Sequence, residues 1–142
     1  MREIKFRAFD KKNKEMCEVM IITFDINRNI TTVGVRTSNG KHHNINCKDV
    51  ELMQFTGLKD KNNKEIYERD ILKVQFHYFG DTKVNEYKDG VVKFNEASFD
   101  IYRGDIDVAY WEYWDSLSEV ALNNLVEIIG NVYKNPELLK EK

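Results

Sequence analysis

Two cysteines and a pair of neighbouring histidines are the residues that most resemble a metal site. Cys17 and Cys47 are the only cysteines of the chain, and His42 and His43 lie between them. Thiolates and imidazoles are ligands of structural zinc, but such sites usually bring their cysteines in closely spaced pairs, which this chain lacks. A free cysteine otherwise behaves as a small apolar residue. We therefore predict neither a metal site nor a bound cofactor.

Residue types suited to nucleophilic catalysis are present, but their pattern is not specific. Cys47, His43 and Asp49 would supply a nucleophile, a base and an orienting carboxylate. Any chain of 142 residues offers such trios. The chain has no Gly-x-Ser-x-Gly elbow, no phosphate-binding glycine-rich loop, no His-Glu-x-x-His and no Ser-x-x-Lys. We expect no catalytic residues and a protein that is not an enzyme.

A group of aromatic residues has the greatest binding potential in the sequence. It consists of Tyr110, Trp111, Tyr113 and Trp114. Aromatic side chains serve protein interfaces and also stack on single-stranded nucleic acid. No Lys or Arg lies between positions 104 and 133, so this group lacks the positive charge that phosphate binding requires. Packing in the core and binding of a protein partner both remain open for this group, and we take its four residues as the candidate partner-binding residues.

A set of basic residues near the N-terminus favours a different partner. The set comprises Arg2, Lys5, Arg7, Lys11, Lys12 and Lys14. Residues 1–64 hold 13 basic and 8 acidic residues, and residues 65–142 hold 9 and 16, so the halves carry +5 and −7. Nucleic acid is bound through positive charge, so binding through the N-terminal half is the alternative function. A solvated charged face would explain the same residues without any partner.

Length and composition are those of a small globular protein. The chain has 142 residues, of which 42% are hydrophobic and 32% charged, enough for one domain or two very small ones. Its longest apolar run covers residues 19–22, far short of the roughly 18 residues that span a membrane. The opening residues MREIKFR alternate in charge, whereas a secretory leader needs an apolar run. We expect no membrane association, a cytoplasmic protein and reduced cysteines.

The sequence predicts short strands separated by turns, and these strands would position the candidate residues named above. Alternating polar and apolar residues over 4–8 and a β-rich run over 16–24 predict a hairpin. Further strands are predicted over 30–37 and 42–45, with Asn39-Gly40 in the turn between them. Residues 50–55 fit a strand or a helical turn. No internal repeat is visible in the sequence.

The polar segment GLKDKNNK at residues 57–64 separates this part from a second run of strand signals. Strands are predicted over 71–76, 91–94 and 99–102, with Asp89-Gly90 as a turn. The spacing Ser116-x-x-Glu119 is typical of a capping box and predicts a short helix, which a strand near residues 125–129 follows. The chain ends in a helical turn that Asn135-Pro136 begins.

These patterns predict a mainly β fold with minor short helices. We expect a small antiparallel SH3-like barrel in the C-terminal part, packed with an N-terminal β-hairpin unit. The expected division is residues 1–56 for the N-terminal unit and residues 57–142 for the barrel and the C-terminal helical turn. The two parts can also form one compact unit.

Three sequence blocks resemble the YopX family of phage and prophage proteins. They are REIKFRAFDKKNKEM at residues 2–16, QFTGLKDKNNKEIYERDIL at 54–72 and EIIGNVYKNPELL at 127–139. The resemblance implies a phage-encoded protein in the cytoplasm of the bacterial host, with a β-rich fold whose C-terminal part is similar to small SH3-like barrels. It implies no catalytic residue, because the family is known chiefly as one of unknown function.

The chain departs from the family pattern at two positions. Arg69 stands where the family tends to have a glycine before the aspartate, and Asn63 stands where a turn glycine is common. Asparagine tolerates the left-handed backbone conformation, whereas arginine tolerates it poorly. Together these observations predict a non-enzymatic phage accessory protein that acts by protein–protein contact and forms a homo-oligomer.

Overall fold

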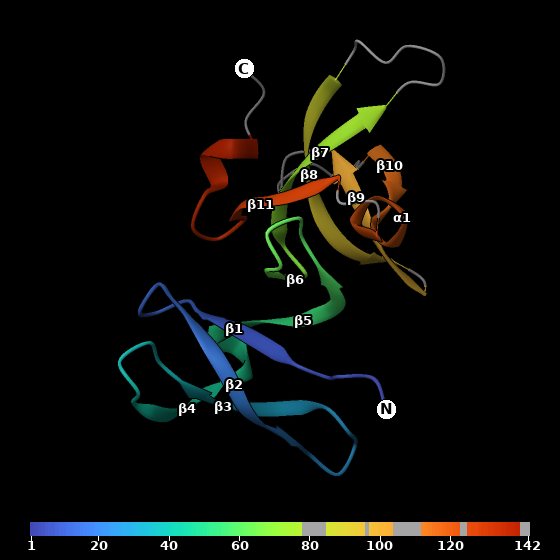
Figure 1. Cartoon of the computed structure of the whole chain (residues 1–142). Helices are drawn as coiled ribbons and strands as arrows, with labels where there is room; N and C mark the ends of the chain where they lie inside the picture. Colours follow the sequence, from blue (N-terminus) through green and yellow to red (C-terminus); the bar gives the residue numbers. More distant parts are fainter. Residues whose placement is uncertain (78–84, 96, 104–111, 123–124, 140–142) are drawn as a thin grey trace. The chain divides into compact units, whose positions relative to one another are not determined.

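The structure is a computed structural model that describes residues 1–77, 85–95, 97–103, 112–122 and 125–139 (Figure 1). The chain divides into two compact units, Met1–Phe55 and Thr56–Lys142. Both are built from antiparallel strands with short helices between them, so the predicted mainly β class is confirmed. Over the described ranges, no helix is both long and apolar enough to cross a membrane.

The first unit is a meander of strands joined by short turns. Its elements are β1 (Phe6–Asp10), β2 (Glu15–Phe24), β3 (Ile30–Arg36), β4 (His42–Asn46), the 3-10 helix η1 (Cys47–Asp49) and β5 (Val50–Lys59), whose last four residues belong to the second unit. The sheet order is β4-β3-β2-β1-β5-β6, with β6 (Glu65–Tyr67) in the second unit. The predicted hairpin of β1 and β2 is confirmed, and the ambiguous residues 50–55 form a strand on the other side of β1.

Alternate residues of these strands share one buried face. The core consists of Ala8, Cys17, Val33, Val35, Ile45 and Val50. Side chains two apart along a strand lie on the same face, which is how Val33 and Val35 reach the core from one strand. Cys17 therefore acts as a small apolar core residue.

The second unit contains a five-stranded sheet in the order β10-β9-β8-β7-β11. Its elements are β7 (Asp70–His77), β8 (Asn85–Asn95), β9 (Ser98–Arg103), β10 (Glu112–Ser116), α1 (Leu117–Leu122), β11 (Val126–Asn131) and η2 (Pro136–Leu139). Leu72 and Val74 pack with Leu117 of α1, whereas Ile71 and Val91 pack with Val132 and the C-terminal turn. Because neighbouring residues of β7 face opposite sides, the sheet is covered on both faces.

The two units repeat one strand order that the sequence does not reveal. In the first, β1 pairs with β2 and with β5, and η1 joins β4 to β5. In the second, β7 pairs with β8 and with β11, and α1 joins β10 towards β11. The chain thus contains two copies of a topology in which the first strand lies between the second and the fifth.

The predicted turn at Asp89-Gly90 is wrong, because both residues lie inside β8 and pair with Lys73 and Leu72 of β7. Pairing with a neighbouring strand along its length outweighs the local turn preference of this dipeptide. No pairing among the described residues joins β10 to β11, so the sheet is not shown to close, and the SH3-like barrel stays a prediction.

Candidate functional site

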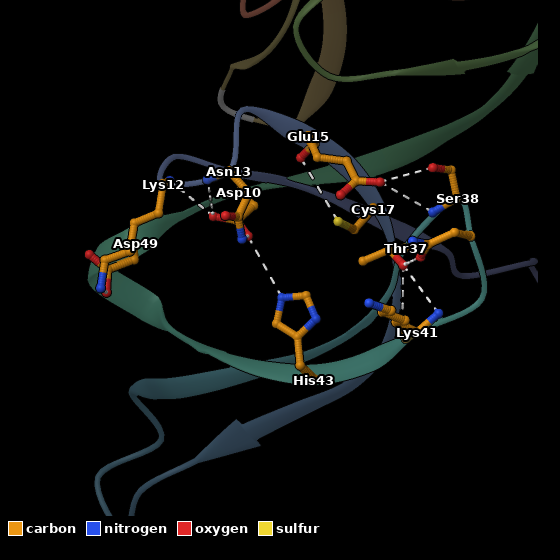
Figure 2. A network of polar contacts seen from close by, with 11 residues as sticks. Asp10, Lys12, Asn13, Glu15, Cys17, Thr37, Ser38, Lys41, His43 and Asp49 are labelled. Atoms are coloured by element: carbon orange, nitrogen blue, oxygen red, sulfur yellow. Dashed lines mark hydrogen bonds and ion pairs between the residues drawn. The ribbon is translucent and has the colours of Figure 1, made fainter.

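Asp10, at the end of β1, is a buried carboxylate at the centre of a polar network (Figure 2). It is only 3% exposed. Its Oδ1 accepts hydrogen bonds from the backbone N–H groups of Lys12 at 3.0 Å and Asn13 at 3.1 Å, and its Oδ2 accepts one from the Asn13 side chain at 2.8 Å. This carboxylate therefore holds the turn in which Lys14 adopts a positive φ of 55°.

His43, on β4, lies next to this carboxylate. Its Nε2 is 3.7 Å from Oδ2 of Asp10, and Figure 2 shows the ring directed at Asp10. Burial of Asp10 opposes its ionisation, but the hydrogen bonds from Asn13 and Lys12, with His43 close by, outweigh this effect and lower the pKa of its carboxyl. A carboxylate beside an imidazole resembles an acid–base pair, yet 3.7 Å exceeds hydrogen-bond distance. The pair is therefore better suited to joining β4 to the β1–β2 turn than to proton transfer.

The two cysteines and the proposed trio do not assemble into a site. Neither thiol is in a disulfide: Cys17 is buried and donates weakly to the carbonyl of Glu15 at 3.9 Å, and Cys47 is half-buried in η1. The carboxylate beside His43 is Asp10, whereas Asp49 forms an ion pair with Lys12. Within the described ranges, no group of three or more His, Cys, Asp and Glu side chains could hold a metal ion.

Several of the predicted nucleic-acid-binding lysines are engaged with carboxylates. Lys5 pairs with Glu3 at 2.7 Å, Lys11 with Glu51 at 3.0 Å and Lys12 with Asp49 at 3.2 Å. Lys14 is exposed, and Arg7 is half-buried on β1. Neighbouring acids reduce the positive potential of the set, and this weakens the case for phosphate binding.

The aromatic group lies at the limit of what the structure describes. Tyr110 and Trp111 fall outside the described residues, whereas the backbones of Tyr113 and Trp114 lie on β10. The pairing of β10 with β9 shifts register between Tyr113 and Asp115, so Trp114 is the extra residue of a β-bulge. The group stays a predicted partner surface.

In the second unit, a buried carboxylate in the polar segment at residues 57–64 holds the turn that follows β5. Asp60, 5% exposed, follows β5 directly. Its Oδ1 accepts from the backbone N–H groups of Asn62 and Lys64, both at 2.9 Å, and its Oδ2 accepts from that of Ile128 at 3.0 Å. One carboxylate thus closes the β5–β6 turn and ties it to β11.

Asp70 and Arg69 hold the next connection, between β6 and β7. The Oδ2 of Asp70 accepts from the backbone N–H of Tyr67 at 2.8 Å. Arg69 has a positive φ of 67°, its N–H donates to the carbonyl of Val92 at 2.9 Å, and its carbonyl accepts from Val132 at 3.0 Å. These two bonds hold Arg69 in a conformation that glycine adopts more easily.

Sequence reasoning missed an apolar surface at the far end of the β2–β3 hairpin. We call these residues the hairpin patch: Met20, Ile21, Phe24 and Ile26 are exposed by 52%, 62%, 57% and 96%. Ile21 lies opposite Gly34 on the outer face of the sheet, whereas Phe24 lies opposite Ile30, which packs against the core. The apolar run at residues 19–22 indicates a strand, but it does not show which side chains the sheet leaves uncovered. Ile21 stands over Gly34, where an added Cβ would lie 3.2 Å from the Ile21 Cβ.

Comparison with known proteins identifies the family of this chain. The family model described as "YopX protein" matches residues 5–140. The chain belongs to the YopX family. The solved structure of protein EF1440 from Enterococcus faecalis is similar to this YopX-family chain, with 26% sequence identity and a TM-score of 0.66. The similarity covers 99% of this chain and 100% of the EF1440 chain. The search of curated proteins found no match to the chain.

Proposed function

We propose that this YopX-family chain is a phage- or prophage-encoded accessory protein of the bacterial cytoplasm that acts by contact with another protein and without catalysis. The observation that carries the proposal is the hairpin patch. Four large apolar side chains, each more than half exposed, lie within seven positions of one hairpin. Clustered exposed apolar side chains mark interaction surfaces more often than scattered ones do.

The polar side chains support the same proposal. The buried carboxylates Asp10, Asp60 and Asp70 all accept hydrogen bonds from turn backbone, so each has a structural task. The predicted aromatic group from Tyr110 to Trp114 would add a second contact surface in the acidic half of the chain. Nucleic-acid binding by the N-terminal basic set is the alternative.

The SH3-like barrel is part of this proposal. The order β10-β9-β8-β7-β11, with α1 before the last strand, supports a five-stranded barrel that closes by curvature of the sheet. A barrel of this kind does not itself determine the function, which depends on the surface that the fold presents.

Affinity capture with matched variants tests the proposal. Tagged wild-type chain, Phe24→Lys and Leu122→Lys are expressed in the host and their bound proteins compared by quantitative mass spectrometry. Leu122 is 75% exposed on α1, outside the hairpin patch, so it controls for an added charge on exposed apolar surface. We expect proteins, including further copies of the chain, that the wild type and Leu122→Lys retain and Phe24→Lys loses. Equal capture by all three variants would contradict the proposal.

A further inference from the structure

The second half of β2 has a strand neighbour on one side only. β1 pairs with residues 15–18 of β2, whereas β3 pairs with β2 as far as Phe24. Among the described residues, no further backbone hydrogen bond reaches residues 19–24. The chain before β1 follows β5 instead, since the carbonyl of Lys5 accepts from the N–H of Phe55 at 2.9 Å.

This open edge lacks the features that usually prevent strands from pairing. Residues 19–24 read VMIITF, with no charge and no proline. Folded proteins commonly protect an exposed edge with charged side chains, proline or a short strand. The outermost strands of the same sheet fit that rule: β4 is short and polar, and β6 has only three residues. The edge of β2 is the exception.

The hairpin patch adds apolar area to this edge. At roughly 150 Å² or more for each fully exposed large side chain, the four residues present about 400 Å² of accessible surface. Two such patches supply about 800 Å² before backbone and flanking residues are counted, and specific interfaces begin near about 1,000 Å². Side-chain area alone therefore falls short of a specific interface, and backbone hydrogen bonds between the paired edges must contribute the rest.

We propose that residues 19–24 pair with the same residues of a second copy, antiparallel and about a two-fold axis, so that one sheet continues through both chains. Uncharged identical segments suit this arrangement, because antiparallel pairing of a strand with itself obeys two-fold symmetry. The side chains of the hairpin patch then lie beside those of the second copy as cross-strand neighbours. The inference rests on the proposed function, protein contact, and names a second copy as the partner.

The test combines oligomeric state with backbone protection in the full-length chain. Analytical ultracentrifugation over a dilution series measures the dimer dissociation constant, and hydrogen–deuterium exchange is recorded at both ends of the series. We expect the wild type to dimerise, with amides of residues 19–24 exchanging more slowly at high concentration. We expect Ile21→Lys to raise the dissociation constant by about 30-fold, the effect of one interface hot spot. Leu122→Lys should leave it unchanged.

Three results would overturn the inference. The first is a wild type that stays monomeric. The second is a dimer whose amides at 19–24 exchange at the same rate at every concentration, and the third is a dimer that Ile21→Lys leaves intact. If Ile21→Lys fails to fold in a thermal melt, the exchange data on the wild type decide alone. A monomeric wild type that still captures another protein through Phe24 would end this inference and leave the proposed function standing.

Discussion

At the residue scale, buried carboxylates of this chain act on the backbone rather than on a ligand. Asp10, Asp60 and Asp70 are each at most 5% exposed, and each accepts at least one hydrogen bond from a turn N–H. An ionised acceptor forms stronger hydrogen bonds than a neutral one, which offsets the cost of its burial. Exchange of such a residue should therefore change stability more than activity.

The first prediction concerns Asp10→Asn. We expect a loss of about 1–3 kcal/mol in the free energy of unfolding at pH 7, since the turn N–H groups lose a charged acceptor. The pKa of Asp10 lies below its ordinary value of 3.8, so the contribution of the carboxylate is present above that pH and disappears as the pH falls through the lowered pKa. The difference between variant and wild type should shrink below about pH 4. Urea unfolding at neutral and acid pH measures both effects.

Asp25→Asn is the matched control. Asp25 accepts backbone bonds from Asn27 and Asn29 in a similar turn, but it is exposed, so water can replace the lost interactions. The stability of this variant should change far less than that of Asp10→Asn. Equal losses from the two substitutions would show that burial of Asp10 has no energetic role.

The second prediction concerns Arg69→Gly, which should stabilise the protein. The left-handed conformation costs a residue with a Cβ about 1–2 kcal/mol, and glycine avoids this cost but gains freedom in the unfolded chain. We expect a net gain of about 1 kcal/mol, read from the midpoint of urea unfolding. Asn63→Gly, at a φ of 65°, should gain less, because asparagine tolerates this region. A destabilised Arg69→Gly would mean that the arginine side chain contributes more than the backbone strain removes.

At the element scale, the turn between β5 and β6 depends on β11. Asp60 closes this turn with one carboxylate oxygen and holds Ile128 with the other. A side chain that joins segments 68 positions apart can form both sets of bonds only once the strands have assembled. The turn is thus stabilised jointly with the sheet.

The third prediction follows for Asp60→Asn. The amide can accept with one atom only, so its NH₂ group must face either the turn N–H groups or the N–H of Ile128. We expect a loss of about 2–3 kcal/mol in the free energy of unfolding, because a buried donor then opposes a donor. Hydrogen exchange at the Ile128 amide should accelerate. Asp89→Asn, an exposed position on β8, is the control and should show neither effect. Unchanged exchange at Ile128 would contradict the assigned bond.

At the scale of the whole molecule, charge differs between the two units. Residues 1–55 hold 10 basic and 7 acidic residues, a net charge of +3, so the remaining 12 basic and 17 acidic residues leave −5 on residues 56–142. Ion pairs within the first unit reduce its field further. This distribution favours contact with proteins over contact with nucleic acid.

The fourth prediction tests this ranking. In a salt-titrated gel shift we expect no submicromolar binding of single- or double-stranded DNA at physiological ionic strength. Changing Lys11, Lys12 and Lys14 together to Glu should leave self-association unaffected. Submicromolar affinity that falls steeply with salt and disappears in the triple variant would reverse the ranking in favour of nucleic acid.

Patterns in the sequence were sufficient for the class of the fold and for most of its elements. Alternation of polar and apolar residues placed β1 and β2, and Asn135-Pro136 placed the turn η2. The three family blocks predicted the family, which the match over residues 5–140 confirms. Arg69 and Asn63 were singled out from sequence, and both have a positive φ. These features depend on residues that are close together in the sequence, so the sequence alone was enough to predict them.

Other features depend on contacts between distant residues, and the tertiary structure decided them. Asp89-Gly90 became the interior of β8 because β7 pairs with it. The pairing of β1 with β5 and of β7 with β11 gives the two units the same strand order, although the sequence contains no visible repeat. The open edge of β2 arises because β1 stops pairing at Glu18 while β2 continues to Phe24. Local sequence specifies which side of a strand is apolar, but only the packed neighbours determine whether that side is covered.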